Sequence, residues 1–275
     1  QIAITVAEHG YAVAVSELLL NASFDDVMAS ASRLLGRHMA QYLDVQARNT
    51  LGAATSAVFG YDRSGISGGA FTNYDEGTKA ANLAGVSANH KLTTGSVKDA
   101  ALTLASKNIP RLGETYVMFI NPKQSRDIRS NPEFIEVTKY AAPGNFMLGE
   151  IGRLYDVVFI ETTQVKKIAS GTAVNYSSII GAPADQTEVP VKANTGPGTG
   201  GNPENPGQSA PTGTTATDVY ESIMIGDNAF GHAISLPVEL RDGGVLDFGR
   251  EHALAWYAIW GLGVITDQAI CKVYT

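Results

Sequence analysis

The feature that most restricts the possible folds is an amphipathic stretch over residues 23–51. Its apolar side chains recur at intervals of three and four residues, which predicts one long helix with one buried stripe. Ser23 is the candidate N-cap, with Asp26 three residues later, and Gly52 follows the predicted end. About 27 residues at 1.5 Å each give a helix of roughly 40 Å, so we expect a spine against which sheets pack. The stripe consists of Phe24, Val27, Met28, Ala31, Leu34, Leu35, Met39, Tyr42 and Leu43.

The opposite side of this helix is polar and is expected to face solvent. In the middle of the helix, Gly36 costs about 1 kcal/mol relative to alanine, which predicts a bend or a close contact at that point. The polar side consists of Arg33, Arg37, Gln41, Asp44 and Arg48.

Composition excludes several classes of protein. With 44% hydrophobic and 17% charged residues, the 275-residue chain can bury a core as one large domain or two closely joined ones. A net charge of −7 and a longest basic run of only Lys166-Lys167 argue against a dedicated nucleic-acid-binding domain. The single cysteine, Cys271, cannot form an intrachain disulfide and is expected to be a small buried side chain.

The sequence also predicts no membrane partner, because no apolar run approaches about 18 residues. It begins at Gln1 in the middle of a strand-like pattern and without a basic-then-apolar leader. We therefore expect that an upstream segment belongs to the protein.

Residues 1–20 alternate between apolar and polar side chains in two pieces, separated by Glu8-His9-Gly10. This pattern predicts extended structure, with Gly10 as a bend or bulge. The segment has too few apolar residues for a core of its own, so we expect a neighbour to cover it.

The rest of the chain indicates mixed helices and strands. Helices are predicted at residues 92–108 and at residues 123–129, the second after Asn121-Pro122 as N-cap and first helical residue. Residues 62–90 lack periodicity and predict a long loop, and residues 183–217 are dense in Pro, Gly, Thr, Asn and Ser, which predicts an exposed excursion. Strands are predicted at residues 55–61, 116–120, 157–163, 219–225, 253–264 and 269–274, with a helix as the alternative for 253–264.

No catalytic, cofactor-binding or metal site is predicted. Gly65-Ile66-Ser67-Gly68-Gly69 fits the G-x-S-x-G pattern of a hydrolase nucleophile, but no strand leads directly into it and no helical stripe follows. Phosphate-loop, H-E-x-x-H, paired C-x-x-C and EF-hand patterns are absent from the sequence. The histidines are scattered at positions typical of isolated surface or core residues: His9, His38, His90, His232 and His252.

Two glutamates, Glu150 and Glu161, stand in or beside apolar strand-like segments. A carboxylate in such a place more often pairs with an arginine at an interface than takes part in catalysis, and Arg153 and Arg129 are the candidate partners. The sequence thus has a spine helix, an arm that needs a neighbour and long glycine-rich excursions, which favours an assembly protein over an enzyme. The predicted contact residues between subunits are Glu8, Gly10, Arg129, Glu150, Arg153 and Glu161.

Three short motifs carry a resemblance to a known family. Residues 116–129 (YVMFINPKQSRDIR) resemble the strand, Asn-Pro turn and helix of tailed-phage major capsid proteins. Residues 149–153 (GEIGR) with 157–163 (VVFIETT), and residues 225–231 (IGDNAFG), resemble two later segments of the same proteins. The sequence is most similar to the capsid family of N4-like podoviruses, within the HK97-like fold.

The resemblance implies an α+β, HK97-like capsid fold with a long spine helix, a P domain, an A domain and an E-loop. Residues 1–20 would be part of the E-loop, as its returning strand, and residues 21–91 would be the P domain with the spine helix and the long loop. Residues 92–247 would form the A domain, with the exposed insertion 183–217. Residues 248–275 would be closing strands that return to the P domain.

The function implied is that of a major capsid protein. It would assemble with itself as pentamers and hexamers into an icosahedral shell around a double-stranded DNA phage genome. The partners implied are packaged DNA, bound without sequence preference, and portal, scaffold and decoration proteins; the location implied is the virion, after assembly in the host cytoplasm. An encapsulin-type nanocompartment on the same fold is the alternative, and a small serine hydrolase using Ser67 is the third.

Overall fold

The computed structural model describes residues 2–63, 77, 79–81, 83–131, 150–170, 173–175, 212–214 and 217–275. The chain divides into two compact units. Unit 1 comprises Gln1–Thr50 and Phe230–Ile265, and unit 2 comprises Leu51–Ala229 and Thr266–Thr275. This division cuts across the predicted segments 21–91 and 92–247, because it places residues 51–91 in unit 2 and residues 230–247 in unit 1.

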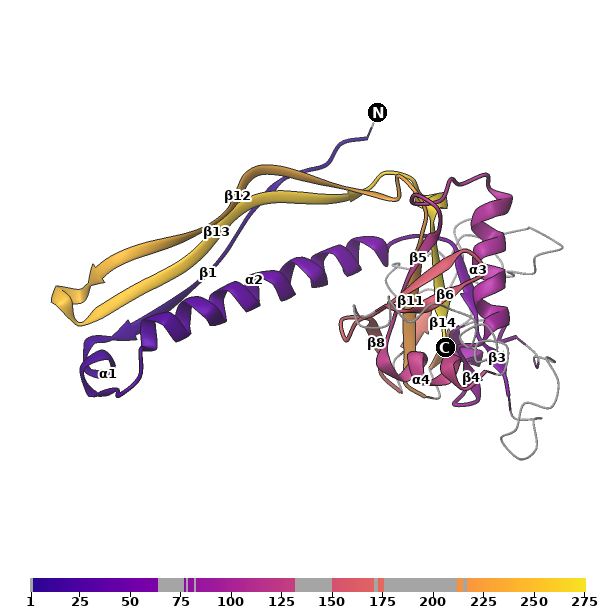
Figure 1. The fold of residues 1–275 in the computed structure, drawn as a ribbon, viewed down its shortest axis with the longest axis horizontal. Coiled ribbons are helices and arrows are strands. Elements are labelled where there is room, and N and C mark those ends of the chain that lie inside the picture. The colour runs from indigo at the N-terminus through magenta and orange to yellow at the C-terminus, as the bar shows by residue number, and fades with distance from the viewer. Residues whose placement is uncertain are drawn as a thin grey trace. The chain divides into compact units, whose positions relative to one another are not determined.

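Unit 1 contains the long helix and a three-stranded antiparallel sheet of order β1-β13-β12 (Figure 1). Its elements are β1 (Ala7–Ser16), α1 (Glu17–Ala22), α2 (Val27–Leu51), β12 (Phe230–Leu246), the short 3₁₀ helix η3 (Asp247–Gly249) and β13 (Glu251–Val264).

The predicted spine helix exists, but it begins four residues later than predicted. α2 starts at Val27, where the Asp26 carboxylate accepts a hydrogen bond from the Ala29 N–H at 3.0 Å. Ser23 instead ends the six-residue helix α1. The prediction of extended structure through Leu20 is therefore wrong beyond Ser16, whose side chain caps α1. No residue of α1 is buried, so this helix has no apolar stripe that a periodicity argument could detect.

β1 is one regular strand, which corrects the expectation of two extended pieces with a bend or bulge at Gly10. It pairs with β13 from Ala7 opposite Trp260 to Ser16 opposite Glu251 without a register shift, so Gly10 is neither a bend nor a bulge. A Cβ at Gly10 would lie 3.0 Å from the Trp256 carbonyl oxygen, so glycine permits a close strand approach. β13 of the same chain pairs with one edge of β1. Apart from the buried Val15, β1 stays exposed or half-exposed, so the expectation that a further neighbour covers this segment stays a prediction.

The 17-residue strand β12 had no counterpart in the sequence prediction. Its pairing with β13 shifts register between Ile234 and Leu236, between Leu236 and Glu239, and between Asp242 and Gly244. Each shift changes which side chains face the core, so no continuous period of two marks this strand in the sequence.

The core of unit 1 lies between α2 and the aromatic face of β13. Leu35 of α2 is only 1% exposed and packs with Trp256 and Trp260, whose rings stack at 6.0 Å. Two polar contacts lie within this layer: Trp256 Nε1 donates to His38 Nδ1 at 3.2 Å, and His9 Nδ1 lies 3.0 Å from the Tyr42 hydroxyl. Trp260 Nε1 is buried there without a hydrogen-bond partner among the described residues. The helical stripe and the strand thus bury each other along most of the predicted pattern. Two predicted members of the stripe are wrong: Leu34 is 59% exposed, and Phe24 precedes α2 and is fully exposed.

Unit 2 is built on a seven-stranded mixed sheet, with β8 paired to β11 beside the main order β2-β14-β11-β5-β7-β6. The pairs β14–β2 and β5–β7 are parallel and the others are antiparallel. The sheet strands are β2 (Ala57–Phe59), β5 (Tyr116–Ile120), β6 (Glu150–Leu154), β7 (Val157–Glu161), β8 (Lys166–Ile168), β11 (Val219–Ile225) and β14 (Ile270–Tyr274). The remaining elements are β3 (Tyr61–Asp62), η1 (Leu83–Gly85), β4 (His90–Lys91), α3 (Thr94–Ser106), α4 (Pro122–Arg129), β9 (Ala173–Asn175), β10 (Thr212–Thr214) and η4 (Asp267–Ala269).

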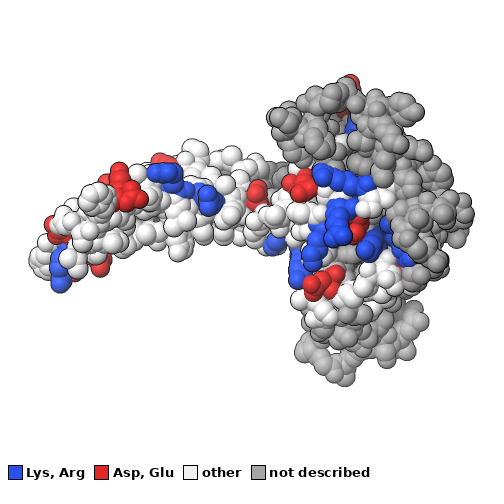
Figure 2. Space-filling model, turned by 60° about the horizontal axis from the view of Figure 1, so that its bottom comes forward, with Lys and Arg blue, Asp and Glu red and all other residues white. Residues whose placement is uncertain are grey.

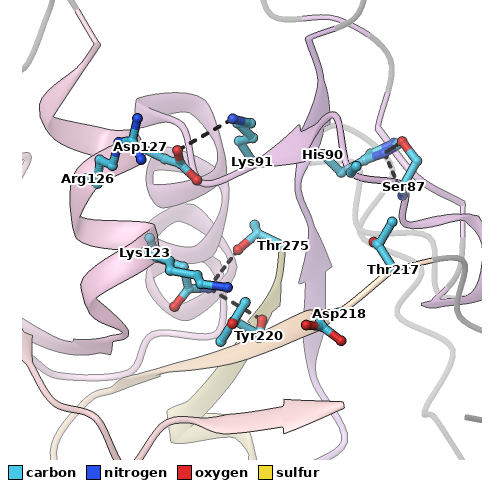
Figure 3. Close-up of a pocket in the computed structure, with 12 residues that line it drawn as sticks. Ser87, His90, Lys91, Lys123, Arg126, Asp127, Thr217, Asp218, Tyr220 and Thr275 are labelled. Carbon is cyan, nitrogen blue, oxygen red and sulfur yellow. Dashed lines mark hydrogen bonds and ion pairs between the residues drawn. The ribbon is translucent and has the colours of Figure 1, made fainter. Parts of the chain in front are cut away.

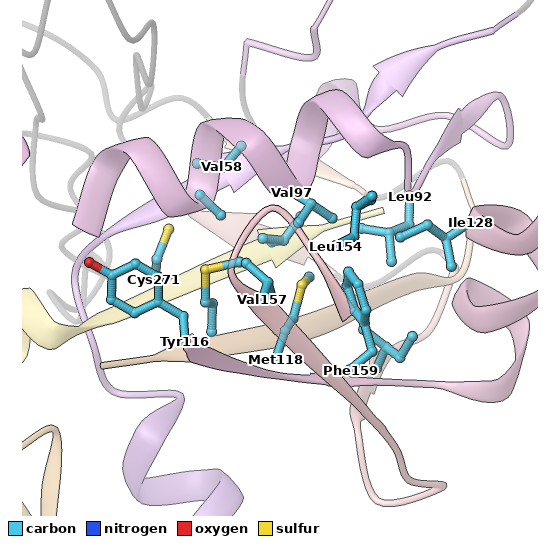
Figure 4. Packing of buried hydrophobic residues seen from close by; sticks show 14 of the residues in the cluster. Val58, Leu92, Val97, Tyr116, Met118, Ile128, Leu154, Val157, Phe159 and Cys271 are labelled. Carbon is cyan, nitrogen blue, oxygen red and sulfur yellow. The ribbon is translucent and has the colours of Figure 1, made fainter. Parts of the chain in front are cut away.

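The core of unit 2 lies between α3, α4 and this sheet (Figure 4). Val97 and Leu104 of α3, Met118 of β5 and Phe159 of β7 are completely buried there. Cys271 is also 0% exposed, as expected of a small apolar side chain. The predicted bounds of the strands and helices in this core are confirmed within a few residues. Their apolar side chains are buried along most of each element, so the sequence pattern is regular.

We expect Leu35→Ala to lower the free energy of unfolding of unit 1 by about 2–5 kcal/mol, because it removes a fully buried side chain. Urea unfolding followed by tryptophan fluorescence measures this in unit 1 alone, since both tryptophans of the chain lie in β13. Leu34→Ala is the matched control: that side chain is 59% exposed, and its loss is expected to change stability by less than about 0.5 kcal/mol. Equal effects of the two substitutions would contradict the packing described here.

Candidate assembly surfaces

Two of the predicted contact residues, Glu8 and Gly10, lie in β1. β1 is at the edge of its sheet, so its outer backbone edge has no strand partner in the part of the chain that the structure describes. Glu8 is exposed and accepts a hydrogen bond from the Tyr257 phenol; desolvation first, and then this bond, raises the pKa of Tyr257. The edge is thus regular, accessible and free of proline, which is the geometry that another extended segment can pair with.

Arg129 and Glu161 are brought together in unit 2. Arg129 ends α4 and Glu161 ends β7, and their Nη2 and Oε2 atoms are 3.9 Å apart. Both side chains are partly exposed, so the pair contributes at most about 1 kcal/mol and can exchange for another partner.

Arg153 lies elsewhere and does not contact Glu161. It pairs with Glu114 at 3.5 Å and with Asp156 at 3.9 Å, near the turn that leads into β7. The backbone of Glu150 starts β6 opposite Ile160, and its side chain is outside the described part of the structure. The sheet therefore separates the predicted contact residues of unit 2 into groups at its two ends.

A basic surface that the sequence analysis missed lies beside α4. A cavity of about 450 Å³ opens between α4, β4 and the start of β11, and Lys91, Lys123 and Arg126 line it (Figure 3). Figure 2 shows lysines and arginines crowded over one face of unit 2, with carboxylates among them. The signal that could have revealed it is the spacing of Lys123, Arg126 and Arg129 in an eight-residue helix, where every third residue is basic.

Gln124, a buried side chain of α4, connects this helix to its neighbours by hydrogen bonds. Asn121 caps the helix as predicted, and Gln124 completes a capping box by accepting from the Asn121 N–H at 3.0 Å. The same amide accepts from Ser222 Oγ at 2.7 Å and donates to Thr275 Oγ1 at 2.6 Å. These bonds fix α4 to β11 and to the residue after β14, so the basic side chains project from a rigid support.

Carboxylates neutralise part of this basic surface. Lys91 pairs with Asp127 at 3.7 Å and Lys167 pairs with Asp218 at 2.7 Å. The hydrogen bond from Lys167 lowers the pKa of Asp218 and raises that of Lys167, so both groups stay charged at neutral pH. A surface of partly paired charges is suited to a reversible protein contact.

His90 forms the wall of the cavity and accepts, at Nδ1, a hydrogen bond from the Ser87 N–H at 3.0 Å. Burial lowers its pKa, and the charge of Asp62 opposes this in part. The other four histidines lie in unit 1, and no cluster of potential metal ligands occurs among the described residues. Ser67, the hydrolase candidate, lies outside the described residues, as do most of residues 62–90 and 183–217. Among the described helices, none is both long and apolar enough to cross a membrane.

The comparison with protein families decides what kind of protein this is. A family model described as phage capsid protein matches residues 1–272 of the 275. The chain belongs to this family. It is a phage capsid protein, it forms the capsid shell by association with copies of itself, and it is a structural component of the virion. A search of curated proteins found no match.

Solved structures place the capsid protein in the HK97-like fold. The capsid of Ralstonia phage GP4 is 14% identical with a TM-score of 0.61, and covers 99% of this chain and 73% of its own. The head structure of Helicobacter pylori bacteriophage KHP40 is 13% identical with a TM-score of 0.60, covering 99% and 75%. The α+β, HK97-like fold with its long helix is thereby confirmed. The narrower resemblance to N4-like podoviruses stays a prediction.

The fold is shared with an encapsulin. A holo-SrpI encapsulin complex from Synechococcus elongatus matches with 11% identity and a TM-score of 0.52, covering 98% of this chain and 73% of its own. The fold alone therefore does not separate virus shells from nanocompartments, and the family match carries that distinction.

We expect the stability of unit 2 to fall as the pH drops below about 6.5. The unfolded chain binds a proton on His90 near the ordinary histidine pKa of about 6.5, whereas the folded protein resists protonation because the ring is desolvated. Protonation of His90 therefore lowers the free energy of unfolding below that pH, and His90 makes no pH-dependent contribution above it. His90→Gln should lose less stability than wild type between pH of about 7.5 and about 5.5, measured as the urea midpoint of the unit 2 transition by circular dichroism. His232→Gln, in unit 1, is the control, and equal losses in wild type and His90→Gln would contradict the assignment.

Proposed function

We propose that this capsid protein assembles as pentamers and hexamers into an icosahedral shell that encloses a double-stranded DNA phage genome. The observation that carries the proposal is the family match over residues 1–272, on a chain built around a 25-residue helix. Portal, scaffold and decoration proteins are the further partners proposed, and the host cytoplasm is the proposed place of assembly. The protein acts by binding and not by catalysis, in keeping with the weak sequence context of Ser67.

We assign the two units to the domains of such a shell subunit. Unit 1, with α2 and the β1-β13-β12 sheet, corresponds to the P domain, and unit 2 corresponds to the A domain. The E-loop assignment expected for residues 1–20 is narrowed to the segment before Ala7, because residues 7–16 pair with β13 within unit 1 and Glu17–Ala22 form α1.

Apart from Glu150, whose side chain lies outside the described structure, the residues proposed to contact neighbouring subunits are exposed or partly exposed. In unit 2 the ion pairs of Arg129 and Arg153 are longer than 3.4 Å and partly exposed, so a neighbour can replace them at little cost. Gly10 and Glu8 lie on the open edge of β1. The complete set proposed is Glu8, Gly10, Arg129, Glu150, Arg153 and Glu161.

Electron microscopy of the expressed protein, together with its mass in solution, tests the main proposal. Closed icosahedral shells or rings of five and six subunits are expected. A monomer that never assembles, even with a scaffold protein present, would overturn it and return attention to Ser67, whose replacement by alanine would then be assayed for loss of hydrolysis. Shells that contain a protein cargo bound through a short peptide, and no nucleic acid, would favour the encapsulin alternative.

We expect Arg129→Glu to raise the protein concentration needed for shell assembly several-fold while changing the stability of the free subunit by less than about 1 kcal/mol. Light scattering during assembly and urea unfolding of the subunit measure the two effects. Arg111→Glu is the matched control, because Arg111 is similarly exposed and pairs with Asp156 at 2.8 Å but is not among the proposed contacts. If both variants assemble like wild type, Arg129 is not a contact between subunits.

A further inference from the structure

The face of α2 that is turned away from the sheet carries an ordered row of charges. Its members follow one another at spacings of four, four, three and four residues, so they share one side of the helix. The opposite side packs Ala31 and Leu35 on Trp256 and Trp260. The row consists of Arg33, Arg37, Gln41, Asp44 and Arg48, and the first four of these residues are exposed.

Arg33 and Arg37 have no partner within the described part of the chain. No ion pair or hydrogen bond joins either guanidinium to another described residue, although other exposed arginines of unit 1 are paired: Arg241 binds Glu239, and Arg250 binds Asp247 at 2.6 Å. Two like charges four residues apart on a helix repel each other. Their placement thus weakens α2 and gains nothing within the subunit.

Gly36 lies between these arginines on the same face. A Cβ at this position would meet nothing within 4 Å, so no close contact with a described residue requires glycine, and the sequence-based expectation of such a contact is wrong. A glycine inside a helix is unfavourable relative to alanine. Gly36 and Ala40, one turn apart, are both exposed and have little or no side chain. A binding partner can therefore come close to the helix backbone beside the two arginines. Two independent features that cost stability therefore coincide on one face, which indicates a partner there.

The charge of this face selects a polyanion as the partner. Arg33, Arg37, Arg48 and Asp44 give a local net charge of +2 in a chain whose total is −7. The two unpaired arginines are about 6 Å apart along the helix axis, and duplex DNA presents about one phosphate charge for every 1.7 Å of its axis. A duplex can therefore satisfy both guanidinium groups without a specific geometry, whereas a protein carboxylate partner would have to be placed individually for each.

We propose that this face of α2 binds the phosphate backbone of double-stranded DNA, without reading its sequence. The proposal rests on the proposed function and adds which surface of the subunit meets the genome. The basic surface beside α4 is the weaker candidate, because carboxylates pair with Lys91 and Lys167 there.

The salt dependence of DNA binding tests the proposal. The probe is a short fluorescent DNA duplex of random sequence, and its anisotropy is measured with the full chain over a range of salt concentrations. The variant Arg33→Gln/Arg37→Gln should flatten the plot of log affinity against log salt concentration by about 2, since each lost phosphate contact removes about 0.9 from the slope. Arg241→Gln/Arg250→Gln is the matched control, with the same change of charge in the same unit, and should leave the slope unchanged.

The outcomes separate this inference from the proposed function. Equal slopes for both variants, or no binding of the duplex by wild-type protein, would overturn the DNA contact even where wild-type shells form. Loss of assembly in Arg33→Gln/Arg37→Gln without DNA present, with an unchanged far-ultraviolet circular dichroism spectrum, would identify a second copy as the occupant and also overturn it. Failure of the wild-type protein to assemble at all would instead count against the proposed shell function.

Discussion

The mutual burial of α2 and β13 is the constraint on which unit 1 depends. A helix of 25 residues with only a narrow buried stripe draws its stability from packing and not from its own hydrogen bonds. β13 supplies the surface for that packing through Trp256 and Trp260, and it is hydrogen-bonded to β1 on one side and to β12 on the other. Because Trp256 and His38 also share a hydrogen bond, the helix cannot rotate about its axis without leaving a buried donor unpaired.

Unit 2 differs from unit 1 in that it carries charged side chains at fixed positions beside a mixed sheet. Gln124 connects the cap of α4, β11 and the end of the chain through bonds to Ser222 and Thr275. Lys123 and Arg126 flank this buried amide in α4, so their backbone positions are fixed, and Lys123 Nζ also lies 5.3 Å from the centroid of the Tyr220 ring. Contacts between shell subunits have to be geometrically accurate and individually weak, and exposed ion pairs on a rigid helix meet both needs.

The two proposed contact surfaces differ in how their charges are treated within the subunit. Around α4 most cations have carboxylates beside them, which suits exchange with a neighbouring protein that carries both signs. On the outer face of α2, Arg33 and Arg37 have no partner among the described residues, and no described atom lies within contact distance of a Cβ at the neighbouring Gly36. An assembled shell has one surface toward its contents, and an unpaired basic face on an otherwise acidic chain is consistent with that position.

The amino-acid sequence by itself determined those elements in which one set of apolar side chains, regularly spaced, faces the core. These are the stripe of α2, the apolar strands β5 and β11, the cap of α4 at Asn121-Pro122, and the three motifs that indicated the capsid family. Only the tertiary structure decided the rest, because it depends on residues far apart in the chain. The pairing of β1 with β13 joins segments about 240 residues apart, and it alone explains why Gly10 is a glycine. β12 was invisible because its register shifts interrupt the period of two, and α1 because it buries nothing. Arg129 and Glu161 meet only because α4 and β7 end side by side, and local periodicity carries no information about which strand ends will be neighbours.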